Sequence, residues 1–190
     1  MESGKVLEKR TVITQEKKGM TARDMLLIGI LLAAGAVLKF FVGSFFNFAG
    51  MKPNFVIAMY CLIILLIRPK VYEAAVIGLL AGFVCQFFPG QPYLNFASEL
   101  VGAVAMSLLI RIPMTIKKFS LHPIVATFLS TLFSGFTFVG VMYFLYFTGY
   151  DIKPTPLGLF LGIILGTALF NSLLVQLLHL PLSLMLKKQR

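Results

Sequence analysis

The chain contains 190 residues, of which 58% are hydrophobic and only 13% are charged, and its mean hydropathy is +0.92. A soluble domain of this length cannot bury so much apolar surface, so the composition excludes a soluble globular fold. It predicts instead an all-α, polytopic membrane protein whose helices pack together within a lipid bilayer.

The basic residues are segregated along the chain. All of the 17 Lys and Arg except Lys39, Lys52 and Lys153 lie in residues 5–23, in alternate connections between the apolar segments, or at the C-terminus. This is the positive-inside pattern, and it places both termini in the cytoplasm. The net charge of +10 therefore orients the chain in the membrane and does not indicate a nucleic-acid partner. Residues 1–19 are polar and without periodicity, which predicts a flexible cytoplasmic tail before a transmembrane domain over 20–190.

Six apolar segments predict six transmembrane helices in this N-in, C-in arrangement. In chain order, they cover residues 21–46, 55–67, 71–88, 96–110, 123–147 and 156–186. The second is short for a bilayer, so we expect protein to surround it or its start to lie below the membrane surface. The third carries Gly78 and Gly82 at a spacing that lets two helices pack closely. The last is longer than a bilayer requires, so we expect it to tilt, to bend at Pro181 or to emerge.

The connection between the first two helices contains a candidate anion site. Pro53 is compatible with the first turn of a helix, because that position has no intrahelical partner for an N–H group. Lys52 then lies beside the free N–H groups of the helix start, where the cation and the helix dipole together stabilise a carboxylate. In the alternative interpretation, Lys52 extends into the lipid headgroups, as lysines that flank a membrane span commonly do.

Glu99 is a second candidate for a functional charge, because it lies one turn inside the helix predicted over 96–110. A carboxylate at that depth is uncommon and indicates a functional site, unless it lies near enough to the surface to reach water. The sequence contains no paired carboxylates at that depth, no phosphate-binding P-loop and no His-Glu-x-x-His zinc motif. Cys61 and Cys85 lie inside apolar segments without the spacing of metal ligands, which is typical of core residues. We therefore expect no catalytic residue, no metal site and no bound cofactor.

Two short motifs resemble those of a known family. The stretch Gly50-Met51-Lys52-Pro53 and the later stretch Phe88-Pro89-Gly90-Gln91, followed by Asn95, occur in a chain with a short second helix and rigid connections. The chain resembles the substrate-binding S component of an energy-coupling factor (ECF) transporter. Within that group it is most similar to the tryptophan transporter family, and the resemblance covers residues 21–188.

The resemblance implies an ABC-type importer in the bacterial cell membrane, in which this chain captures the solute outside. It implies as partners two ATPase subunits, which hydrolyse the ATP, and a transmembrane T subunit, which couples them to this chain. It further implies that the first and third connections gate an outward-facing pocket. The small residues of the first helix, here Gly29, Ala33 and Ala36, are implied to dock on the T subunit.

A tryptophan zwitterion needs a cation for its carboxylate, an anion or carbonyl groups for its ammonium, and apolar walls with one acceptor for its indole N–H. Lys52 and Glu99 are the candidates for the two charged ends. The candidates for walls and polar contacts are Phe46, Asn54, Phe55, Gln86, Tyr93, Asn95 and Phe96. These side chains are equally compatible with packing, since the chain contains 19 Phe. It contains no Trp, which suits a transporter made when tryptophan is scarce.

Three alternatives are open on the sequence. The chain is compatible with an S component for a vitamin or another small metabolite. It is also compatible with a stand-alone secondary transporter, for which Glu99 is the candidate coupling-ion site. A structural membrane protein of the cell-elongation type would need no solute at all.

Overall fold

The structure is a computed structural model, and six helices make up most of it. It describes residues 19–45, 53–89, 91, 93–113, 115–116, 119–152 and 154–188. The helices are α1 (Ala22–Phe45), α2 (Val56–Ile67), α3 (Val71–Cys85), α4 (Leu94–Leu109), α5 (His122–Phe147) and α6 (Leu157–Lys188). A hairpin of two short strands, β1 (Thr115–Ile116) and β2 (Phe119–Ser120), joins α4 to α5. The predicted all-α class is confirmed, while the hairpin was not predicted.

The helix ends agree with the predicted ends to within two residues, with α3 as the exception. We expected this helix to continue to Phe88, whereas it ends at Cys85. Pro89 accounts for the difference, because a proline disfavours the helical conformation of the residue before it. The chain instead forms tight turns after Cys85, where the backbone N–H of Gln86 donates to the carbonyl of Phe83 at 2.9 Å.

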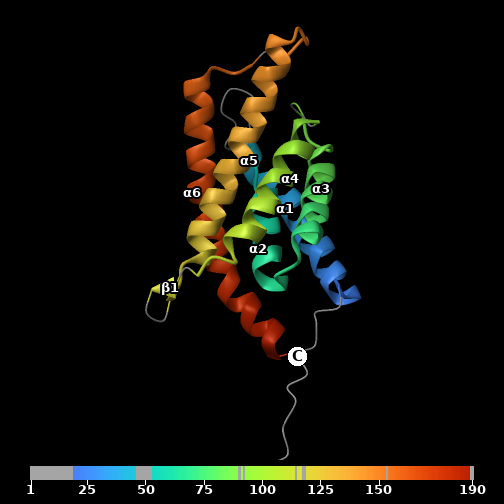
Figure 1. Cartoon of the computed structure of the whole chain (residues 1–190), viewed down its shortest axis with the longest axis vertical. Helices are drawn as coiled ribbons and strands as arrows, with labels where there is room; N and C mark the ends of the chain where they lie inside the picture. The colour runs from blue at the N-terminus through green and yellow to red at the C-terminus, as the bar shows by residue number, and fades with distance from the viewer. Residues whose placement is uncertain are drawn as a thin grey trace, which may run out of the picture.

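The short helix α2 is the core of the bundle (Figure 1). It contacts all five other helices, and every one of its residues except Leu66 is buried. A helix that is apolar on all sides is stable only when neighbours cover all of its faces. The expectation that protein surrounds this short segment is therefore confirmed.

Glycines allow the closest helix contacts. A Cβ atom added to Gly78 of α3 would lie 2.6 Å from the carbonyl oxygen of Glu99, and one added to Gly82 would lie 2.9 Å from the Cα of Phe96. These two glycines thus seat α3 directly on the backbone of α4, as their spacing predicted. Gly35 does the same for α1, because its added Cβ would lie 3.1 Å from the Cα of Val56 in α2.

Three of the described helices, α1, α5 and α6, are each long and apolar enough to cross a membrane. The other three are apolar but have only 12 to 16 residues. With 32 residues, α6 is about 48 Å long at 1.5 Å per residue. Its C-terminal part, which contains Pro181, leans away from the line of its first part in Figure 1. Residues 53–55 and 86–89, together with 148–152 and 154–156 of the connection between α5 and α6, lie at the upper end of the bundle in this view.

Candidate functional site

A cavity of about 310 Å³ lies within the upper end of the bundle. Five helices and all three upper connections contribute to its walls. The lining residues are Lys39, Asn54, Ile57, Phe88, Pro89, Gln91, Asn95, Ser98, Glu99, Thr131, Ser134, Gly135, Phe138, Val139, Met142, Thr155, Phe160, Ile163, Ile164 and Thr167. Pockets for small ligands have volumes of about 300–1,000 Å³. The cavity therefore has room for a small metabolite.

Glu99 lies at the base of this cavity and is fully buried. One of its carboxylate oxygens accepts a hydrogen bond of 2.5 Å from the side-chain amide of Asn54, and the other accepts one of 3.3 Å from the hydroxyl of Ser134. Both donors are neutral, so they orient the carboxylate without cancelling its charge. A buried carboxylate whose charge is not cancelled by its hydrogen-bond donors favours the binding of a cation in the cavity.

Asn54 makes contacts with three helices, α3, α4 and α6. Besides its bond to Glu99 of α4, its side chain lies 3.8 Å from the thiol of Cys85 at the end of α3. Its backbone carbonyl accepts a hydrogen bond of 3.2 Å from the side-chain amide of Asn171, which is fully buried in α6. A single residue before α2 thus fixes the carboxylate relative to α3 and α6.

Lys39 of α1 supplies a cation to the same cavity, and its side chain is only 7% exposed. Its ammonium nitrogen lies 3.3 Å from the Cys85 sulfur and 5.0 Å from the centre of the Phe88 ring. It also interacts electrostatically with Glu99. Lys39 was not among the site candidates predicted from the sequence. The signal was present, because Lys39 lies inside a long apolar segment and breaks the positive-inside pattern.

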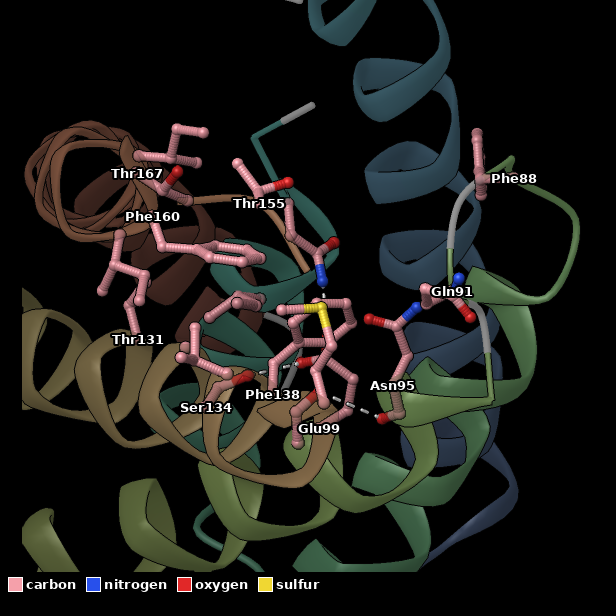
Figure 2. Close-up of a pocket in the computed structure, with 18 of the residues that line it drawn as sticks. Phe88, Gln91, Asn95, Glu99, Thr131, Ser134, Phe138, Thr155, Phe160 and Thr167 are labelled. Carbon is pink, nitrogen blue, oxygen red and sulfur yellow. Dashed lines mark hydrogen bonds between the residues drawn. The ribbon is translucent and has the colours of Figure 1, made fainter. Parts of the chain in front are cut away.

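The remaining walls of the cavity are largely apolar. Figure 2 shows Phe160 and Thr167 of α6 on one side, Gln91 and Asn95 on the opposite side, and Glu99 with Ser134 low between them. The rings of Phe138 and Phe160 lie 6.4 Å apart and form an aromatic surface where α5 meets α6. The cavity therefore combines two opposite charges with an aromatic wall, which suits a solute with a polar end and an apolar end.

The predicted binding residues fall into two groups. Asn54, Asn95 and Glu99 line the cavity together. The other described candidates lie elsewhere: the Phe55 ring packs 5.0 Å from Phe170, Phe96 packs on Gly82, Gln86 donates to the carbonyl of Gly82, and Tyr93 is 80% exposed. Phe46 and Lys52 lie outside the described residues, so the anion site proposed for Lys52 stays a prediction.

The predicted docking residues lie on the outward side of α1. Gly29 and Ala33 are exposed and Ala36 is half-buried, and a Cβ added to Gly29 would have no neighbour within 4 Å. The opposite side of α1 carries Gly35 and Lys39, both of which are buried. One helix therefore contributes a charge to the cavity and presents small residues outward.

A second hollow, of about 420 Å³, runs along α6 outside the cavity. Its walls include Pro53, Phe55 and the glycine series Gly158, Gly162 and Gly166. No atom lies within 4 Å of a Cβ added to any of these glycines.

Within the described part of the chain, no group of three or more His, Cys, Asp or Glu side chains is placed to hold a metal ion. Cys61 and Cys85 are both buried free thiols. Comparisons with protein-family models, with curated proteins and with solved structures found no match.

Proposed function

We propose that this chain is the substrate-binding membrane subunit of an ECF-type ABC importer and that its solute is tryptophan. The observation that carries the proposal is the cavity at the upper end of the bundle, in which buried Lys39 and Glu99 face a space with an aromatic wall. The resemblance of residues 21–188 to S components adds support. In this function the chain captures the solute outside the bacterial cell membrane, and a T subunit with two ATPase subunits drives its release inside.

This function requires all six helices to lie in the membrane with both termini inside. Three helices are long enough to cross alone, and the three short apolar helices pack within the same bundle. The basic connections then face the cytoplasm, and the end that holds the cavity faces outward.

The orientation predicts the outcome of cysteine labelling in intact cells. Asp151 lies in the connection between α5 and α6, Arg111 lies between α4 and the β1–β2 hairpin, and both are exposed. These two connections are at opposite ends of the bundle in Figure 1. Asp151→Cys should react with a membrane-impermeant maleimide, whereas Arg111→Cys should react only after the cells are opened. The natural cysteines are buried and should give a low background. Labelling of Arg111→Cys in sealed cells would contradict the proposed orientation.

Tryptophan fits the cavity through its chemistry. Its indole can lie against the Phe138 and Phe160 rings, which form the aromatic wall of the cavity. Neutral partners for the indole N–H are present in Asn95, Thr131 and Thr155. Burial of an aromatic side chain contributes more binding free energy than any single polar contact, so the indole should dominate affinity.

The test is assembly followed by uptake. The tagged chain, expressed with the T subunit and both ATPases of its own organism, should purify as a complex and import radiolabelled tryptophan only when ATP is hydrolysed. An ATPase variant without its phosphate-binding lysine is the control and should abolish uptake. Proton-driven uptake by the lone chain would indicate a secondary transporter, and purification with cell-shape proteins in the absence of any solute would indicate a structural role. Either result would overturn the proposal.

A further inference from the structure

We infer that the cavity recognises both ends of a free α-amino acid, with the carboxylate bound by Lys39 of α1 and the ammonium bound by Glu99 of α4. This inference rests on the proposed function and specifies the class of its solute. It assigns the carboxylate to Lys39, a residue inside the bundle, and requires no contribution from the connection between α1 and α2.

The first step is that the two charges are held apart. Three consecutive contacts join them: Lys39 Nζ lies 3.3 Å from Cys85 Sγ, that sulfur lies 3.8 Å from Asn54 Nδ2, and the same amide donates to Glu99 at 2.5 Å. A pair with a purely structural role would form a direct ion pair, because a buried charge is costly without its partner. Here a thiol and an amide separate the charges.

The second step is that each charge retains unused binding capacity. An ammonium group has three donors, and the described contacts of Lys39 are a thiol, which is a weak acceptor, and the face of a phenyl ring. The Glu99 oxygens accept from an amide and a hydroxyl, which leaves lone pairs for a further donor. Both residues line the cavity, so a solute there can reach both.

The third step is that the separation matches a zwitterion. A solute with only one charged group satisfies one side and leaves the other buried charge without compensation. An α-amino acid carries both groups on neighbouring carbons and replaces the thiol and amide contacts with two charge-assisted hydrogen bonds. Such a site rejects an analogue that lacks either group, because the protein group is then left unpaired.

Calorimetry on the purified full-length chain tests this inference with three probes. These are tryptophan, tryptamine, which lacks the carboxylate, and indole-3-propionate, which lacks the ammonium. For the natural chain, we expect each analogue to bind about tenfold to a hundredfold more weakly than tryptophan. Lys39→Met should weaken tryptophan binding to the level of tryptamine and leave tryptamine binding unchanged. Glu99→Gln should weaken tryptophan binding and leave indole-3-propionate binding unchanged.

Lys70→Met is the matched control, because it makes the same chemical change at an exposed lysine at the start of α3. It should leave the affinities for all three probes unchanged. The inference would be overturned if the natural chain bound either analogue as tightly as tryptophan or more tightly. It would also be overturned if Lys39→Met lost affinity equally for all three probes while its thermal unfolding showed an intact fold. Uptake of an uncharged solute in place of tryptophan by the assembled importer would also overturn it and would exclude tryptophan as the solute, while the role as a subunit of an ECF-type importer would stand. Since calorimetry uses the chain alone, failure to assemble with the ATPases would count only against the importer function.

Discussion

A leucine in place of Gly78 is expected to push α3 away from α4 and to cause a large loss of stability. The Cβ atom alone would lie 2.6 Å from the Glu99 carbonyl oxygen and 2.9 Å from the Cα of Leu100. Both are backbone atoms, so no rotamer change relieves the clash, and one helix must move. Overpacking of a core costs about 1–3 kcal/mol when side chains can adjust, so we expect a loss at or above the upper end of that range.

The buried cysteines provide the measurement. A thiol-reactive fluorescent dye should react with Cys61 and Cys85 only as the bundle opens, and the midpoint temperature of that reaction reports stability. Gly140→Leu in α5 is the matched control, because no atom lies within 4 Å of its added Cβ. It should unfold at or above the temperature of the natural chain, since leucine favours a helix more than glycine by close to 1 kcal/mol. Equal midpoints for Gly78→Leu and Gly140→Leu would contradict the close contact between α3 and α4.

The same change should also impair the site. Gly78 contacts the backbone of α4 at Glu99, whose carboxylate lies at the base of the cavity. Movement of α4 by even a small distance separates Glu99 from Asn54 and Ser134, whose bonds set its orientation. Stability and solute binding are therefore coupled through this single helix contact.

The helices were predictable because their limits depend on local chemistry. Each span of apolar residues ends at charged or turn-forming residues, as α2 does at Arg68 and Pro69. Arg68 adopts the left-handed conformation there, and its N–H donates to the carbonyl of Ile64 at 2.9 Å. The burial of α2 was also predictable, since a short apolar segment requires cover on every side.

The faces of the helices were less predictable. A helix that is apolar all round has no polar side to indicate which residues point inward. For this reason the sequence did not indicate that Ser134, Phe138 and Phe160 belong to one cavity. Polar residues inside apolar segments or directly before them were better guides, since the predicted candidates Asn54, Asn95 and Glu99 all line the cavity.

Lys39 has two properties that can be recognised in the sequence. By the positive-inside rule, a lysine inside a span is only an exception to the orientation. Its cost of burial is the more informative property, because a membrane helix retains a lysine in its interior when that lysine has a partner or a function. Its contacts with Cys85 and Phe88 join residues 46 and 49 positions apart in the chain, which no local pattern encodes.

Replacing Ala33 by tryptophan is expected to abolish uptake by the assembled importer while the affinity for solute is unchanged. Ala33 is exposed on the outward side of α1, beside Gly29, and lies away from the buried side that carries Lys39. Small residues let a partner helix approach closely, and an indole in that surface prevents the approach. Calorimetry on the purified chain and uptake by the full complex measure the two properties separately.

Gly140→Trp is the matched control for a bulky side chain on a membrane helix. Gly140 is exposed in α5, lies outside the cavity lining and has open space around its added Cβ, so this variant should bind solute and support uptake like the natural chain. Loss of the T subunit from purified Ala33→Trp complexes should accompany the loss of uptake, because docking is the step that the indole blocks. If solute binding falls together with uptake in Ala33→Trp, the outward side of α1 contributes to the cavity or to the fold, and the partner must dock on another surface. Normal uptake would equally exclude α1 as the docking helix, since about 150–250 Å² of aromatic surface cannot be accommodated in a close helix–helix contact.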